Sequence, residues 1–319
     1  EEALSLAQQS GDPLLVALAE WQLGFVLFAL GEYIAAHAHF QRVLAFYEPE
    51  AHHRAFVNLR GSDPGVSALA YDACCLWCLG YPDQADVQSQ EALDLARELG
   101  HAFSLSDVLC FGGCVFNQFR RDAPALERHA EELACLSQDM GFSSFEGTGV
   151  AYRAEALSKM GQVQEGLADL RAGIASREFH SVGCYTPSFL GALGEAQALA
   201  GESQAGLATL DQALDLVEET EERYYEAELR RVRAELLRMQ GEDAAAEDGY
   251  LEAIEVARRQ DAKSWELRTA TGLARLWQEQ GKGEEARQML AEIYGWFTEG
   301  FDTPDLQEAK ALLDKLSSA

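Results

Sequence analysis

The sequence is poor in basic side chains. Lysine and arginine together number 25, against 53 aspartates and glutamates, and the formal net charge is −28. A surface with this charge repels the phosphate backbone of nucleic acids and anionic lipid headgroups. No apolar run approaches the length that spans a bilayer. We therefore expect no nucleic-acid partner and no membrane partner.

Catalytic signatures are missing as well. The sequence contains no GxxxxGK[ST] loop, no HExxH, no GxSxG and no EF-hand loop. The seven cysteines lack the spacing of a disulfide framework, and no basic, apolar leader opens the chain, which favours a reduced, cytoplasmic setting. The chain starts with Glu1 rather than methionine, which suggests a piece of a longer protein. We expect a domain that is not an enzyme and holds no cofactor and no metal, any catalytic activity belonging to upstream domains.

A repeat runs through most of the chain. A glycine stands five positions before a small residue in segments such as FALGEYIAA, SKMGQVQEG and QEQGKGEEA. These glycines are Gly31, Gly80, Gly161, Gly201, Gly241 and Gly281, and Arg121 takes the equivalent place. From Arg121 onward the spacing is 40 residues each time, whereas 49 residues separate Gly31 from Gly80. Such a fixed period is typical of repeat architectures.

Each repeat predicts two antiparallel helices. The glycine makes the tight turn, small residues on both helices allow a close approach, and apolar residues recur every three or four positions. Such a pair buries its apolar face only by stacking on its neighbours. The sequence therefore predicts an all-α solenoid, a right-handed superhelix of about seven 40-residue helix–turn–helix repeats that forms one domain over residues 1–319. Within it we expect the second helix of a truncated repeat at 1–10, an inserted loop at 48–64 and a capping helix at 303–316.

The pattern resembles the tetratricopeptide repeat in a longer variant. Four phrases extend the likeness, namely SDPGVSALAYDACCLWCLGYPDQA, EERYYEAELRRVRAELLRMQG, RRQDAKSWELRTATGLARLWQEQGK and YGWFTEGFDTPDLQEAKALLDKL. They look like the C-terminal region of large bacterial signalling proteins, in which a class III adenylate/guanylate cyclase-like domain or another effector precedes a regulatory ATPase module. The resemblance implies a non-catalytic interaction scaffold, the sensing or partner-binding arm of a larger signalling protein.

Cysteines crowd into one stretch, CCLWC at residues 74–78. Cys75 and Cys78 have CxxC spacing, and Cys110 and Cys114 lie four residues apart on the next first helix. Strong zinc sites place at least one cysteine pair on a knuckle loop, whereas these cysteines fall in the middle of helices among apolar residues. A buried cysteine behaves as a small hydrophobe. The pattern favours packing, with metal or redox chemistry as the alternative.

One face of each first helix is a candidate binding surface. Residues ten, six and three positions before the turn glycine share this face. In the first three repeats this face is largely apolar. Its candidate residues are Trp21, Phe25, Phe28, Cys74, Trp77, Phe111 and Val115, together with Phe119, which lies one position beyond the face. This stripe either buries itself across the superhelix or forms an open hydrophobic groove for an amphipathic peptide or an apolar ligand.

The same face carries charge in later repeats. Its candidate residues are Glu155, Glu195, Glu235, Arg231 and Arg238, with Arg268 and Arg275 beside them. These groups either neutralise one another, each pair being worth little in solvent, or form a polar end of the groove that orients a charged ligand or peptide. Three functions follow: a regulatory arm that binds a protein or peptide, including upstream domains of the same chain; a receptor domain for a small molecule or apolar ligand in the concave groove; or a self-associating scaffold.

Overall fold

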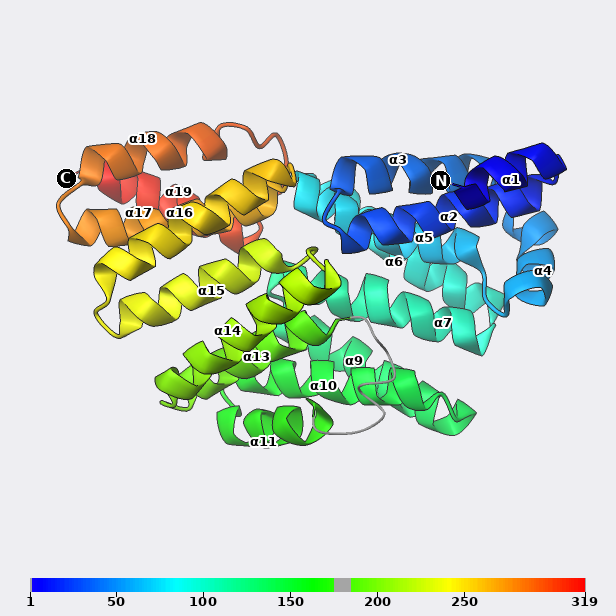
Figure 1. Cartoon of the computed structure of the whole chain (residues 1–319), viewed down its shortest axis with the longest axis horizontal. Coiled ribbons are helices and arrows are strands. Elements are labelled where there is room, and N and C mark those ends of the chain that lie inside the picture. The colour runs from blue at the N-terminus through cyan, green and yellow to red at the C-terminus, as the bar shows by residue number, and fades with distance from the viewer. Residues whose placement is uncertain (1, 175–184, 319) are drawn as a thin grey trace. The chain divides into compact units, whose positions relative to one another are not determined.

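The structure is a computed structural model that describes residues 2–174 and 185–318 (Figure 1). Within these ranges every regular element is a helix, and no strand occurs. The all-α prediction is therefore confirmed. Glu1, the first residue of the helix expected at 1–10, lies outside the described residues, as do residues 175–184 and 319 of the expected single domain.

The chain divides into two compact units. Unit 1 comprises Glu1–Trp77 and Gln84–Arg153, and unit 2 comprises Cys78–Asp83 and Ala154–Ala319. The described helices are, in chain order, α1 (Glu2–Ser10), α2 (Pro13–Ala29), α3 (Tyr33–Phe46), α4 (Pro49–Arg60), α5 (Pro64–Leu79), α6 (Pro82–Leu99), α7 (Ala102–Val108), η1 (Leu109–Val115), α8 (Phe116–Arg120), α9 (Ala123–Met140), α10 (Ser143–Lys159), α11 (Val163–Ile174), α13 (Thr186–Leu199), α14 (Ser203–Thr220), α15 (Glu226–Met239), α16 (Asp243–Arg259), α17 (Lys263–Glu279), α18 (Gly283–Tyr294) and α19 (Pro304–Ser317).

The helices follow one another as pairs joined by short turns, as the repeat predicts. The pairs in the described residues are α2 with α3, α5 with α6, the continuous helix α7–η1–α8 with α9, α10 with α11, α13 with α14, α15 with α16, and α17 with α18. In unit 2, for example, α15 and α16 lie side by side (Figure 1). The six turn glycines all have a φ between 77° and 93°, a left-handed conformation that glycine adopts without a steric penalty.

Arg121 adopts the same turn conformation without being a glycine. Its φ is 62°, a value uncommon for residues that carry a side chain. The Arg121 amide donates to the carbonyl of Gln118 at 3.2 Å, and the Asp122 amide donates to that of Asn117 at 3.0 Å. These bonds close the end of the helix. The feature that these turns share is therefore the left-handed backbone conformation, which glycine provides in six of them and Arg121 in one.

Small residues bring the two helices of a pair close together. A Cβ atom added to Gly24 would lie 2.7 Å from the ring of Phe40, and one added to Gly166 would lie 2.4 Å from the carbonyl oxygen of Ala154. Real Cβ atoms do not approach other atoms this closely, so a larger residue would force the helices apart. The predicted role of the small residues in helix packing is confirmed.

The third first helix contains one extra residue. In the sequence, 41 positions separate Gly80 from Arg121, against 40 for the later pairs, and the helix between them carries the π-helical segment η1. A π-turn absorbs a single inserted residue without breaking the helix. Two of its carbonyl groups accept side-chain hydrogen bonds: Gly112 from the Ser89 hydroxyl and Gly113 from the Asn117 amide, both at 2.7 Å.

The prediction of an inserted loop at 48–64 is wrong, because most of this segment is helix α4. Pro49 stands in its first turn, where its missing N–H is not needed, and Gly61 ends it with a φ of 82°. The ring of Phe56 is fully buried, so the helix has an apolar side that holds it to unit 1. The histidine pair of this segment is therefore helical, with His53 Nδ1 2.7 Å from the carboxylate of Asp63.

A closing helix is present where the sequence predicts one. Helix α19 follows Thr303, with Pro304 as its first residue, and Leu306, Leu312 and Leu316 are buried in the core that α17 and α18 also form. At the other end, α1 occupies residues 2–10 and buries only Ala7. Both helices lie where the 40-residue period places them.

Candidate binding surfaces

The aromatic candidates of unit 1 surround Tyr71, a residue that the repeat pattern does not mark. The ring centroid of Tyr71 lies 3.8 Å from that of Phe111, 5.6 Å from Phe25, 5.7 Å from Phe40, 5.8 Å from Phe28 and 6.2 Å from Trp21. Most of these pairs meet edge to face, which is a favourable arrangement of aromatic quadrupoles. Three successive first helices and one second helix therefore supply a single aromatic cluster.

These side chains contact one another rather than pointing outward. Trp21, Phe28 and Phe111 are each at least 96% buried, and Phe25 is the half-exposed member of the cluster. The rings of Trp77 and Phe119 also meet, with centroids 5.3 Å apart. The geometry favours burial over an open groove for this stripe. That these residues bind a ligand stays a prediction.

The mid-helix cysteines are buried in the same region. The described cysteines are Cys74, Cys75, Cys78, Cys110 and Cys114, all buried, and Cys135, which is exposed; Cys184 lies outside the described residues. The thiol of Cys74 donates to the carbonyl of Phe111 at 3.5 Å, so it bonds a third carbonyl of the π-helical segment. Among the described residues, no group of three or more His, Cys, Asp and Glu side chains could hold a metal ion.

The charged candidates of unit 2 are joined into a ladder, which we call the charge ladder. It runs across α10, α13, α15, α17 and α19 through Glu155, Lys159, Glu195, Arg231, Glu228, Arg268 and Asp305. The Lys159 ammonium lies 2.8 Å from Glu155 and 3.3 Å from Glu195. Because the charges alternate in sign along the ladder, each buried group faces an opposite charge.

Glu228 accepts hydrogen bonds from two arginines of the ladder. Arg231 binds it through two hydrogen bonds of 2.8 and 3.0 Å, and Arg268 adds a third of 3.1 Å. Burial opposes ionisation of Glu228, but the two guanidinium groups outweigh it and lower the pKa to about 2. Arg268 in turn holds Asp305 with bonds of 2.7 and 3.0 Å.

Three predicted charges, Glu235, Arg238 and Arg275, are not members of the ladder. Arg238 donates to Glu235 at 2.8 Å and to Glu279 at 3.2 Å, and the Tyr250 hydroxyl also donates to Glu235. Arg275, predicted beside the stripe, pairs with Glu308 at 2.7 Å. These side chains are between about a quarter and three fifths exposed, so their ion pairs contribute little to stability.

Three members of the ladder were not among the predicted residues. Lys159 follows Glu155 by four positions, a spacing that places them on one helical face. Glu228 and Arg268 occupy the same position in consecutive repeats, 40 residues apart, so they meet only when the repeats stack. Asp305 belongs to the closing helix. Helical spacing could have identified Lys159, whereas the others required the packing of separate repeats.

Another buried carboxylate is Glu222, and within residues 2–174 and 185–318 no cationic side chain pairs with it. It follows α14, is 8% exposed, and accepts a hydrogen bond of 2.5 Å from the backbone amide of Tyr185. Burial disfavours the charged form and raises the pKa of Glu222 to about 7. The Tyr224 hydroxyl donates to Ser188 at 2.9 Å nearby. This turn therefore contains a carboxyl group that titrates near neutral pH.

Raising the pH from about 5 to about 8 should therefore destabilise this turn. The folded-state pKa of Glu222 lies above its unfolded value of 4.5, so the stabilisation is present at acid pH and is lost as the pH rises towards 7. The loss amounts to at most about 3 kcal/mol. Urea titrations at several pH values would measure it, comparing the native chain with Glu222→Gln. The variant should lose this pH dependence, whereas Glu221→Gln, at the exposed neighbouring glutamate, should retain it; a dependence unchanged in Glu222→Gln would contradict the assignment.

Comparisons with known proteins agree with this architecture. The tetratricopeptide repeat model matches residues 22–48. The chain is similar to a Rap protein complexed with competence and sporulation factor, with 12% identity, a TM-score of 0.61, and 94% of this chain and 87% of that chain covered. The fold is tetratricopeptide-like. The chain is also similar to the apo form of RapI, with 10% identity, a TM-score of 0.51, and 94% of this chain and 99% of that chain covered.

A further structural neighbour is a chain of the APC/C hetero-tetramer Cut9–Hcn1, with 13% identity, a TM-score of 0.54, and 95% of this chain and 55% of that chain covered. At identities this low the similarity concerns the fold alone. No curated protein sequence matches the chain. None of the helices in the described ranges is long and apolar enough to cross a bilayer.

Proposed function

We propose that this tetratricopeptide-like chain is a non-catalytic regulatory module that binds a protein or peptide partner. The observation that carries the proposal is the charge ladder, which crosses the first helices of unit 2 and leaves several charges within reach of solvent. The side chains of Lys159, Glu195 and Arg231 are 24%, 27% and 16% exposed. A peptide with side chains of both signs would pair with such an alternating surface and be fixed in register by it.

The fold neighbours support a binding role. One of them is a Rap protein in complex with competence and sporulation factor, and another is the Cut9–Hcn1 assembly. Helical-repeat folds use extended surfaces of this kind to bind partners. The buried aromatic cluster of unit 1 is less suited to binding a partner, because its rings pack against one another and expose little surface.

The wider context of the chain is also part of the proposal. From the resemblance of its sequence phrases, we infer that the module is the arm of a larger cytoplasmic signalling ATPase or nucleotide cyclase-like protein, whose upstream domains are candidate partners. The organisation of residues 1–319 as one domain stays a prediction, as does self-association. The gene region that precedes the codon for Glu1 tests this inference, which fails if that region encodes no nucleotide-binding module.

Selection from a displayed peptide library on the purified chain tests partner binding. We expect enriched peptides that carry charged side chains, and Glu195→Lys should weaken them about tenfold, since it reverses one charge of the ladder. Glu165→Lys makes the same charge change on the exposed side of α11 and should leave binding unchanged. Failure to enrich any peptide would contradict the binding role. Equal binding by Glu195→Lys would show that the ladder only neutralises itself.

A further inference from the structure

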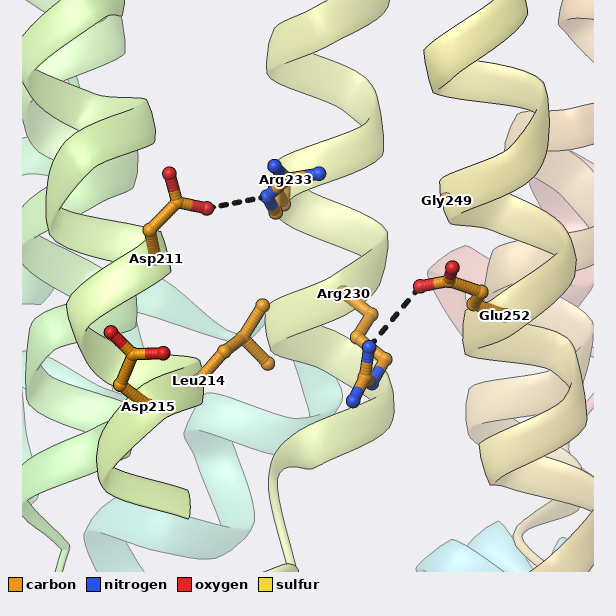
Figure 2. Close-up of a pocket in the computed structure, with 7 residues that line it drawn as sticks. All are labelled: Asp211, Leu214, Asp215, Arg230, Arg233, Gly249 and Glu252. Carbon is orange, nitrogen blue, oxygen red and sulfur yellow. Dashed lines mark hydrogen bonds and ion pairs between the residues drawn. The ribbon is translucent and has the colours of Figure 1, made fainter. Parts of the chain in front are cut away.

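A pocket lies in unit 2 between the second helices α14 and α16, with the first helix α15 between them (Figure 2). Its volume is about 400 Å³, and its lining residues are Asp211, Leu214, Asp215, Arg230, Arg233, Gly249 and Glu252. This volume is within the range of ligand pockets, roughly 300–1,000 Å³. Gly249 forms the wall on the α16 side, where a Cβ atom would lie 3.2 Å from that of Ala234, so the glycine lets α16 pack closely on α15.

Both arginines of the pocket are already engaged by carboxylates. Figure 2 shows Arg233 joined to Asp211 of α14 and Arg230 joined to Glu252 of α16. The distances are 2.7 Å for Arg233–Asp211 and 3.2 Å for Arg230–Glu252. Arg230 also pairs with the buried Glu226 at 2.9 Å. An anionic ligand would have to displace one of these carboxylates, so the arginines do not form an anion site.

The carboxylates of the pocket, by contrast, retain free acceptor oxygens. Asp215 is exposed, and in the described part of the chain no hydrogen bond or ion pair reaches it. Asp211 and Glu252 each accept a hydrogen bond from an arginine through one carboxylate oxygen. The second oxygen of each accepts none from the described residues. Carboxylate oxygens only accept hydrogen bonds, so a complementary ligand must bring donors. With three carboxylates and two guanidinium groups, the lining also carries a net negative charge.

We propose that this pocket binds a basic side chain, the ammonium of a lysine or the guanidinium of an arginine, from a partner protein. Asp215 supplies the main counter-charge, and the second oxygens of Asp211 and Glu252 accept the remaining donors. Leu214 gives the alkyl stem of such a side chain an apolar wall. The net charge of −28 also steers basic partners towards the surface. The inference goes beyond the proposed function, because it places a second contact on the second helices, away from the charge ladder.

Nuclear magnetic resonance on the whole chain can test the pocket with small probes. These are the Nα-acetyl methylamides of lysine, arginine and norleucine, the last having an apolar side chain without charge. The methyl resonances of Leu214 and the Nε–H resonances of Arg230 and Arg233 should shift with lysine and arginine until saturation, but not with norleucine. Asp215→Asn should weaken the basic probes about threefold, as expected for a partly solvated charge pair.

Asp243→Asn provides the matched control. Asp243 is exposed at the start of α16 and outside the pocket, and its replacement removes the same charge, so probe affinity should not change. Shifts that never saturate, or an equal loss in both variants, would overturn the proposal in favour of diffuse attraction. Acetate that shifts the arginine resonances would overturn it in favour of an anion site. None of these outcomes bears on the peptide test with Glu195→Lys, so the two proposals fail separately.

Discussion

Glu228→Gln is expected to lower the free energy of unfolding by about 3–5 kcal/mol. The substitution keeps the shape of the side chain but removes its charge, and Arg231 and Arg268 would then face a neutral amide. Both guanidinium groups are largely buried, with side chains 16% and 5% exposed. Arg231 would keep Glu195, at 3.8 Å, and Arg268 would keep Asp305. Each buried guanidinium group would nevertheless lose its hydrogen bonds to a charged partner, and this loss costs more than the modest net contribution of the intact pair. Urea unfolding followed by circular dichroism would measure the difference.

Glu235→Gln is the matched control for that experiment. Glu235 lies in the same helix and also pairs with an arginine, but its side chain and that of Arg238 are each about a quarter exposed. Water can solvate the arginine left behind, so we expect a loss below about 1 kcal/mol. If the two variants lose the same stability, the distinction between the buried ion pairs of the charge ladder and the solvated pair of Glu235 with Arg238 is wrong.

Tyr71→Ala is expected to be as damaging in unit 1, at about 3–5 kcal/mol. The side chain is 3% exposed and contacts five other aromatic rings. Its removal leaves a cavity that rigid rings from several helices cannot close. The same unfolding measurement applies, with near-ultraviolet circular dichroism reporting the packing of the rings.

Tyr71→Phe separates the ring from its hydroxyl group. Because it retains all the ring contacts, it should cost no more than about 1.5 kcal/mol. A Tyr71→Ala variant that keeps its stability would show that the aromatic stripe is not a core. It would favour the alternative of an open groove formed by Trp21, Phe28 and Phe111.

The repeat architecture could be predicted from the sequence because its causes are local. A turn with a left-handed residue, small residues at fixed distances from it and apolar residues at helical spacing all lie within one 40-residue unit. The closing helix was predicted for the same reason, since Thr303 and Pro304 mark its start. Even so, Arg121 shows that the turn geometry, and not the glycine, is what each unit must preserve.

The errors and omissions arose where a residue's partner is distant in the chain. The segment at 48–64 was expected to be a loop because it interrupts the 40-residue period, but it forms helix α4, whose Phe56 is buried within unit 1. Two of the π-helical carbonyls have partners from other helices of the same unit, Ser89 for Gly112 and Cys74 for Phe111. No local pattern reveals such pairs.

The candidate site divides in the same way. The sequence by itself determined that Trp21, Phe28 and Phe111 lie on the equivalent face of their first helices and that Glu195 and Arg231 lie on that face in later repeats, because the helical period alone sets those positions. Only the tertiary structure decided that the aromatic side chains close around Tyr71 and that Glu228 binds Arg268. Both outcomes depend on how successive repeats stack, which brings together residues about 40 positions apart. The physical reason is that burial and charge pairing are properties of the space between helices, whereas period and turn chemistry are properties of each helix pair.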